Sequence, residues 1–429
     1  MERRAGALIS IDQSALADRL REYFNPSTSD SDVAAIFPSL MMTGNRIIGP
    51  EARKKLLQEH SFDPSRIVRY PFKVFDVRWA YLANIRPLFS EPSPELLAHR
   101  RSTNRFFITR DSADRAIEGV PFYVSRLVCD YDFISGHARH FPFLLSNGFG
   151  GGKRENGLFE NGETHANLSP SARAYLAKLK IRDPDSDPKT ASLIWMHALA
   201  IGYSPAYLAE NADGLRRDWP RIPLPNSRKA LEASAALGEQ VATLLDTERE
   251  VPGITAGKLG AFFRSVAPVT QAGGGHIDTG GEGLAITVGW GHAGKAGVTM
   301  PGKGRAVARA YIPEEREALH AEAKLNHLTA SRAIRQLGAE TLDVYLNDSV
   351  YWRNIPAAVW EFHIGGYQVL KKWLSYRERD LLGRALKPEE AKELTGIARR
   401  IAGILLLQDE LDRNYVSVKS STFDSGGGE

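Results

Sequence analysis

The sequence is poor in cysteine and has no long apolar segment. One cysteine, Cys129, occurs among 429 residues, which excludes an internal disulfide and is typical of a reducing compartment. No apolar run approaches the roughly 20 residues that span a bilayer, and the N-terminal MERRAG is not followed by the apolar core of a signal peptide. These absences predict a cytoplasmic protein with no membrane partner.

Metal ligands are equally sparse. His137 and His140 stand three positions apart, and His320 and His327 flank a predicted helix. No second pair of ligands follows at a spacing that metal sites use. We therefore interpret these histidines as surface or packing residues and expect no metal site.

Loops that carry catalysis are also missing. Residues 289–297, GWGHAGKAG, have part of the spacing of a phosphate-binding loop, but Ala296 replaces the hydroxyl residue that would hold magnesium. Residues 144–153, LLSNGFGGGK, have no acidic residue ahead of them, and residues 183–189, DPDSDPK, crowd their carboxylates between prolines. Both stretches are typical of loops. We expect no catalytic residue in this chain.

The composition is that of a folded protein with a mild basic excess. Hydrophobic residues make up 43% of the chain, enough for cores in two or three subdomains. The net charge is +4 and the isoelectric point is near 8.9. Such a chain attracts nucleic acid strongly only where its positive charge gathers on one face.

The order of elements predicts four segments. Residues 1–60 form a helical connector, residues 61–250 a mixed α+β recognition subdomain, residues 251–415 a glycine-rich β module with a C-terminal helical region, and residues 416–429 a disordered tail. One strand is expected at residues 284–290, LAITVGW. The final helix is predicted to begin with Pro388 and to bury an apolar stripe: Leu394, Ile397, Ile401 and Leu405.

The stretch from Tyr351 to Glu378 gathers tryptophans, tyrosines and lysines around a Gly-Gly pair. From Gly366 onward it is predicted to be a helix, and helical pitch places four residues on its buried face: Tyr367, Leu370, Trp373 and Leu374. The opposite face carries donors and a ring: Gln368, Lys372, Tyr376 and Arg379. Such a face suits phosphates and base edges. An ordinary solvated face is the alternative that the spacing leaves open.

The amino-acid sequences of several segments resemble those of one protein family. The segments are LNDSVYWRNIPAAVWEF followed by IGGYQVLKKWLSYRE, then YPFKVFDVRWAYL at 70–82, RPLFSEPSPELLAHR at 86–100, and LAIGYSPAYLAENADGLRRDWPRIPLP at 199–225. They resemble the C-terminal specificity region of type ISP restriction-modification enzymes and the related adenine-specific DNA methylases of DISARM-type phage-defence systems. The resemblance covers nearly the whole chain in the right order.

This resemblance implies that the methyltransferase is encoded elsewhere. In the family, an adenine methyltransferase domain with a glycine-rich S-adenosylmethionine loop and an Asn-Pro-Pro-aromatic tetrapeptide precedes the specificity region. Here no Pro-Pro pair occurs, and the nearest approach is NPST at 25–28. The resemblance therefore implies target recognition in double-stranded DNA for an adenine-N6 methyltransferase domain or subunit encoded upstream. S-adenosylmethionine is expected in that partner, and no cofactor in this chain.

We expect an α+β fold in which helices join and buttress two strand-rich modules, with helices at the C-terminus. Strands come in clusters bounded by proline and glycine, which disfavours the doubly wound sheet of methyltransferases. The candidate DNA contacts are Arg78, Arg86, Lys295, Lys303, Arg305, Arg353, Gln368, Lys371, Lys372, Tyr376, Arg377 and Arg379. Arg78 has two alternatives, a guanine edge or a buried carboxylate such as Asp76.

Two other functions stay open at this stage. The chain can be a DNA-binding or scaffold subunit that works without a methyltransferase, or an unrelated enzyme with an unrecognised site. A methyltransferase gene immediately upstream would favour target recognition, and methyl transfer by this chain alone would favour the unrelated enzyme.

Overall fold

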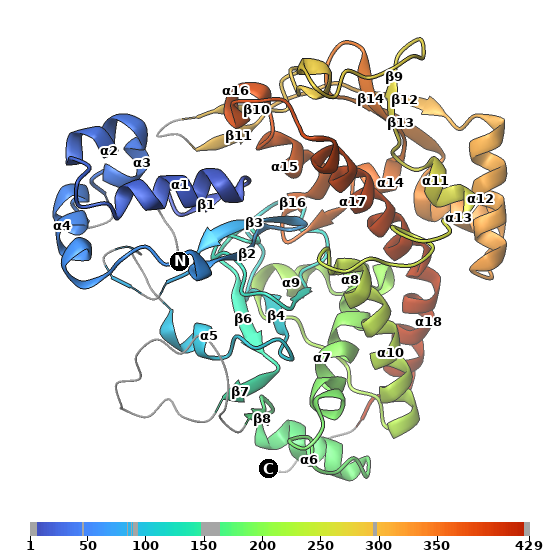
Figure 1. Ribbon diagram of the computed structural model, residues 1–429. Helices are drawn as coiled ribbons and strands as arrows, with labels where there is room; N and C mark the ends of the chain where they lie inside the picture. Colours follow the sequence, from blue (N-terminus) through green and yellow to red (C-terminus); the bar gives the residue numbers. More distant parts are fainter. Residues whose placement is uncertain are drawn as a thin grey trace. The chain divides into compact units, whose positions relative to one another are not determined.

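The computed structural model describes residues 7–44, 47–83, 85–86, 88, 93–146, 164–294 and 298–423 (Figure 1). The chain divides into two compact units. The first contains Met1–Ile108 and Ser125–Asn167, and the second contains Thr109–Val124 and Leu168–Glu429. The boundaries of these two units differ from the boundaries of the four segments expected from the sequence. The division into four segments stays a prediction.

Helices form the beginning of the first unit, as predicted. They are α1 (Gln13–Tyr23), α2 (Asp30–Ile36), α3 (Pro38–Met41), α4 (Gly49–Glu59), a 3-10 turn η1 (Pro64–Arg66) and α5 (Pro94–Ala98). Leu16 and Leu20 of α1 pack with Leu56 of α4 in one buried core. The hydroxyl of Ser29 accepts a hydrogen bond from the Asp32 amide at 3.2 Å and so caps α2.

Short antiparallel strands complete the first unit. β1 (Ile9–Ser10), β3 (Asp76–Tyr81) and β2 (Ile67–Lys73) form one sheet in that order. β4 (Phe106–Thr109) neighbours β6 (Arg139–Pro142), and β7 (Leu144–Ser146) pairs with β8 (Thr164–Ala166). The β2–β3 hairpin places Tyr70 opposite Arg78.

A helical layer forms much of the second unit. Its members are α6 (Pro170–Lys178), α7 (Pro188–Gly202), α8 (Pro205–Glu210), α9 (Ala212–Arg217), α10 (Arg228–Leu245), α17 (Pro388–Leu406) and α18 (Gln408–Ser420). A Cβ on Gly238 would lie 1.9 Å from the Met196 carbonyl oxygen, so α7 and α10 require glycine where their backbones meet. α17 begins with Pro388 and buries the apolar stripe expected of it, which confirms that prediction.

The second unit also contains a four-stranded antiparallel sheet. Its order is β12 (Ala306–Ala310), β13 (Glu340–Tyr345), β14 (Val350–Pro356) and β9 (Val269–Gln271). A separate hairpin pairs β10 (Gly291–Ala293) with β11 (Thr299–Pro301). The surrounding helices are α11 (Ala261–Ser265), α12 (Pro313–Leu325), α13 (Ala330–Leu337) and α14 (Ala357–Trp360), and β5 (Tyr123–Ser125) lies near the boundary of the units in sequence.

Two local predictions were wrong. Residues 284–290 do not form a strand. Leu284 ends the 3-10 turn η2 (Glu282–Leu284), and Ile286 makes a single isolated bridge to Glu378. Residues of this stretch bond to three different segments instead of one partner strand: Thr287 donates to Leu346, Arg379 donates to Ile286, and Leu386 donates to Leu284. The predicted disordered tail is also helical at its start, because α18 extends to Ser420.

The last described residues are held in place as well. The amide of Phe423 donates to the Leu224 carbonyl at 2.7 Å, and its ring meets Tyr175 edge-on with centroids 5.0 Å apart. Residues 424–429 lie outside the described residues. The overall class is nevertheless as predicted: helices with small antiparallel sheets, and no doubly wound parallel sheet among the residues that the structure describes.

Candidate nucleic-acid interface

The Gly-Gly pair of the aromatic stretch forms a hairpin turn. β15 (His363–Ile364) pairs with β16 (Tyr367–Gln368), and Gly365 and Gly366 connect them with φ angles of 53° and 80°. A two-residue turn with positive φ at both positions matches the twist of the flanking strands. The predicted helix therefore begins later than expected, at Val369, and Tyr367 belongs to a strand.

The short helix α15 (Val369–Ser375) buries the face predicted for it. Leu370, Trp373 and Leu374 are all buried, and Trp373 meets Trp352 edge-on with ring centroids 6.4 Å apart. Packing of this kind is the ordinary role of aromatic residues in a core. The apolar half of the predicted pattern is confirmed for these three residues, whereas Tyr367 is half-buried.

The polar half differs from its prediction. Lys372 and Tyr376 are half-buried, and the Lys372 ammonium lies 4.8 Å from the Tyr376 ring centre and 5.1 Å from that of Tyr367. Lys371 is half-buried too. Tyr376 follows the last helical residue, so the helix does not present it as predicted.

Arg379 belongs to the next short helix, α16 (Arg379–Leu382), and is paired. Its guanidinium donates to both carboxylate oxygens of Glu282 at 2.8 and 3.1 Å. This hydrogen bonding raises the pKa of Arg379 and lowers the pKa of Glu282. An exposed carboxylate thus neutralises the charge predicted to face DNA.

Arg377 is a correction to the predicted DNA contacts. Its side chain is 1% exposed, and its guanidinium carbon lies 3.8 Å from the Trp373 ring centre. One guanidinium nitrogen donates to the Trp373 carbonyl at 3.2 Å, and another lies 3.7 Å from Glu393. The residue is part of the core because its aliphatic stem and planar head cover a tryptophan.

Gln368 and Arg78 are likewise engaged within the protein. The Gln368 amide donates to the Trp360 carbonyl at 2.9 Å. Arg78 donates twice to Asp76, at 2.7 and 3.1 Å, and its guanidinium lies 4.0 Å from the Phe72 ring centre. Of the two alternatives for Arg78, the structure shows the pairing with the carboxylate of Asp76. Arg86, by contrast, is exposed.

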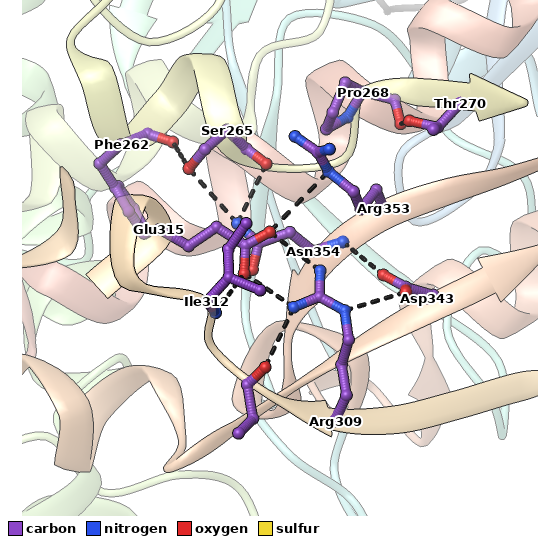
Figure 2. A network of polar contacts seen from close by, with 11 residues as sticks. Phe262, Ser265, Pro268, Thr270, Arg309, Ile312, Glu315, Asp343, Arg353 and Asn354 are labelled. Carbon is purple, nitrogen blue, oxygen red and sulfur yellow. Dashed lines mark hydrogen bonds and ion pairs between the residues drawn. The ribbon is translucent and has the colours of Figure 1, made fainter. Parts of the chain in front are cut away.

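Arg353 borders a buried polar network (Figure 2). Glu315 is buried and accepts two hydrogen bonds from Arg309, at 2.8 and 2.9 Å, while Arg309 also donates to Asp343 at 2.9 Å. The bonds to Glu315, with Asp343, raise the pKa of Arg309. Arg353 is 40% exposed and lies 3.8 Å from Glu315, so it can serve both the network and the surface.

Lys303 and Arg305 lie exposed on the turn that leads into β12. Arg305 places its guanidinium carbon 3.9 Å from the Tyr345 ring centre and one nitrogen 3.9 Å from Asp348. Lys295 lies outside the described residues. Of the predicted contacts that the structure describes, these two turn residues and Arg86 are the exposed ones.

The sequence matches the model of one protein family, described as the type ISP C-terminal specificity domain, over residues 2–396. The chain belongs to this family. The match spans both compact units, as the resemblance of the quoted segments implied. The resemblance to DISARM-type methylases stays a prediction.

Solved structures of larger proteins share the fold of this specificity domain over 96% of the chain. They are a nuclease-deletion mutant of the type ISP restriction-modification enzyme LlaGI with a DNA substrate mimic (13% identity, TM-score 0.51), the ATP-dependent type ISP enzyme LlaBIII bound to DNA (13%, 0.55) and a DrdV–DNA complex (16%, 0.54). The chain spans 32%, 23% and 34% of these proteins respectively. No curated protein matches the sequence.

Sequence reasoning missed two residues of the specificity domain's accessible turn region. Tyr345 and Asp348 were not among the predicted contacts, although the strand alternation around Val344 places Tyr345 on the face opposite the core.

No three metal-ligating side chains converge among the described residues, and no described helix has the length and apolarity to cross a bilayer.

Proposed function

We propose that this specificity domain recognises a particular sequence in double-stranded DNA on behalf of an adenine-N6 DNA methyltransferase. The observation that carries the proposal is the family match over residues 2–396, because the family is described by its role in specificity. Three structures of the same fold are complexes with DNA or a DNA substrate mimic, which supports DNA as the ligand.

The methyl-transfer chemistry is proposed to belong to a separate domain or subunit encoded upstream, which would bind S-adenosylmethionine. An enzyme that methylates adenine in a duplex must extrude the base into a pocket, and the Asn-Pro-Pro-aromatic tetrapeptide that would hold it does not occur in this sequence. A cytoplasmic restriction-modification or DISARM-type phage-defence system is the setting that we propose. The chain would then choose the site at which its partner acts.

Selection from a library of duplexes with a randomised centre tests the proposal. We expect the chain to enrich one sequence pattern, and we expect the upstream methyltransferase, with S-adenosylmethionine, to methylate an adenine in that pattern only when this chain is present. Enrichment without any effect on methylation would favour a DNA-binding subunit that works alone. Absence of sequence enrichment would contradict target recognition.

A further inference from the structure

Three planar side chains form a row across the four-stranded sheet of the second unit. Tyr345 of β13 lies directly opposite Tyr351 of β14, and their rings stack with centroids 5.0 Å apart at 26°. Arg305, just before β12, continues the row with its guanidinium 3.9 Å from the Tyr345 ring centre. Both rings are half-buried, whereas Trp352, the neighbour of Tyr351 on the other face, is fully buried. The row therefore lies on the solvent side of the sheet.

The backbone that carries Arg305 is fixed on both sides. Its carbonyl accepts a hydrogen bond from the Tyr345 amide at 2.9 Å. The preceding Gly304 has φ of 64° and donates to the Gly289 carbonyl at 3.0 Å, and a Cβ there would lie 2.0 Å from the Trp290 ring. The turn thus needs glycine for both its conformation and its packing. Arg305 is consequently presented by a rigid support.

The guanidinium of Arg305 has donors to offer. Its side chain is 46% exposed, and it makes no hydrogen bond within the part of the chain that the structure describes; its nearest carboxylate oxygen, on Asp348, lies 3.9 Å away. The contact between its guanidinium and the Tyr345 ring limits the rotamers of the side chain. A guanidinium whose rotamers are already limited loses less rotamer entropy when it binds a planar ligand edge.

Asp348 is the second polar group at this end of the sheet. It lies at the tip of the β13–β14 hairpin, and its side chain is fully exposed. Asn347 anchors the tip, because its amide nitrogen donates to the Gly283 and Ala285 carbonyls at 2.9 and 3.1 Å. The Asn347 oxygen also accepts the Val350 amide at 2.9 Å. The carboxylate is thus carried on a braced turn.

The two groups together distinguish a base edge from a phosphate. A carboxylate beside an arginine repels the DNA backbone, so the pair suits phosphate poorly. In the major groove, by contrast, arginine donates to O6 and N7 of guanine, and aspartate accepts from the N4 amino group of cytosine. The chemistry of the pair therefore favours a G·C-containing base step over the backbone.

We propose that Arg305 and Asp348 are a base-reading pair for guanine and cytosine in the same or adjacent base pairs, with Tyr345 and Tyr351 as positioning residues for Arg305. This inference rests on the proposed function and goes further, because it names the reading residues and the bases that they read. The exposed Lys303 beside the pair would contact phosphate and contribute affinity without sequence preference.

The test is the same duplex selection, repeated with variants of the full chain. Arg305→Ala removes the guanidinium donors, and we expect it to lose the preference for one guanine by about 5- to 150-fold while other positions keep theirs. Tyr345→Ala should weaken preference at that same guanine, and Tyr345→Phe, which keeps the ring, should not. Asp348→Asn should relax selection at a cytosine in the same or the adjacent base pair.

Two controls separate base reading from a structural role. Lys303→Ala should weaken binding to all sequences alike and leave the selected pattern unchanged. Replacing the guanine in question with 7-deazaguanine, which lacks the N7 acceptor, should weaken binding of the wild-type chain and leave Arg305→Ala almost unaffected.

The outcomes distinguish this inference from the proposed function. If the wild-type chain selects a pattern and the Arg305 and Asp348 variants select the same pattern with the same stringency, the base-reading pair is wrong and target recognition stands. Lower thermal stability without a changed pattern would likewise make the row purely structural. If the wild-type chain selects no pattern at all, both proposals fail.

Discussion

The α15 segment and the turn end of the four-stranded sheet are both rich in cations, yet they differ in what those cations can reach. In the α15 segment, Arg377 is buried, Arg379 is bound to Glu282, and Lys372 lies between two tyrosine rings. At the sheet end, Arg305 is stacked on one face and makes no hydrogen bond within the described residues. Positive residues in a sequence are therefore no measure of charge available to a ligand.

The difference has a physical cause. Arginine is a long side chain whose stem packs well on aromatic rings, so a core can recruit it when a carbonyl or carboxylate accepts its protons. Arg377 meets these conditions through the ring and the carbonyl of Trp373. Arg305 meets the packing condition through Tyr345 but lacks the close acceptor, which leaves its donors for a partner.

The largest expected effect sharpens the contrast between a buried and an exposed ion pair. Glu315→Ala would leave Arg309 with Asp343 and the Ala310 carbonyl, and Arg353 without its nearby carboxylate. We expect a loss of about 3–5 kcal/mol in the free energy of unfolding. Glu282→Ala, at the exposed partner of Arg379, should leave unfolding unchanged. Urea titration followed by circular dichroism measures both, and equal losses would contradict the contrast.

A smaller loss of stability should follow from Arg377→Ala. The substitution removes a desolvated cation from the Trp373 face and the packing of its stem, which together cost about 2–3 kcal/mol. DNA affinity measured under folding conditions should stay the same, since the side chain is buried. If Arg377→Ala kept native stability but bound DNA more weakly, Arg377 would be a DNA contact, as the sequence predicted.

The lysines of α15 should have a moderate effect on binding. Replacing Lys371 and Lys372 by alanine is expected to weaken binding to all duplexes alike and to flatten the logarithmic salt dependence by about two at most, because each phosphate contact contributes roughly one unit. Lys229→Ala, at an exposed residue of α10, is the matched control and should change neither quantity. Fluorescence anisotropy across a salt series decides this. An unchanged slope in the double variant would make α15 a solvated surface.

The last prediction is that no binding of S-adenosylmethionine will be detected. Titration of the chain with S-adenosylmethionine should give no tight, stoichiometric heat of binding, because the sequence lacks the Asn-Pro-Pro-aromatic tetrapeptide and the cofactor loop. Isothermal calorimetry is the measurement, with the upstream methyltransferase as the positive control. Tight binding by this chain alone would overturn the assignment of methyl transfer to a partner.

The amino-acid sequence by itself determined the family, the class of fold and the apolar faces. Periodicity found the buried stripe of α17 and the buried side of α15, because a helix repeats its environment every three to four residues. It misplaced the start of α15, since two consecutive glycines with positive φ end one strand and begin another. Local pattern therefore gave most elements, but it misplaced the start of α15 and predicted a strand at residues 284–290 that does not form.

The tertiary structure alone decided which polar side chains remain available. Arg379 meets Glu282 from 97 positions away, and the Asn347 amide braces the hairpin tip on a carbonyl 64 positions away. Neither contact follows from local spacing, because pairing and burial depend on which segments the fold brings together. For the same reason Tyr345 and Asp348 became candidates beside Arg305 only once β12, β13 and β14 were paired.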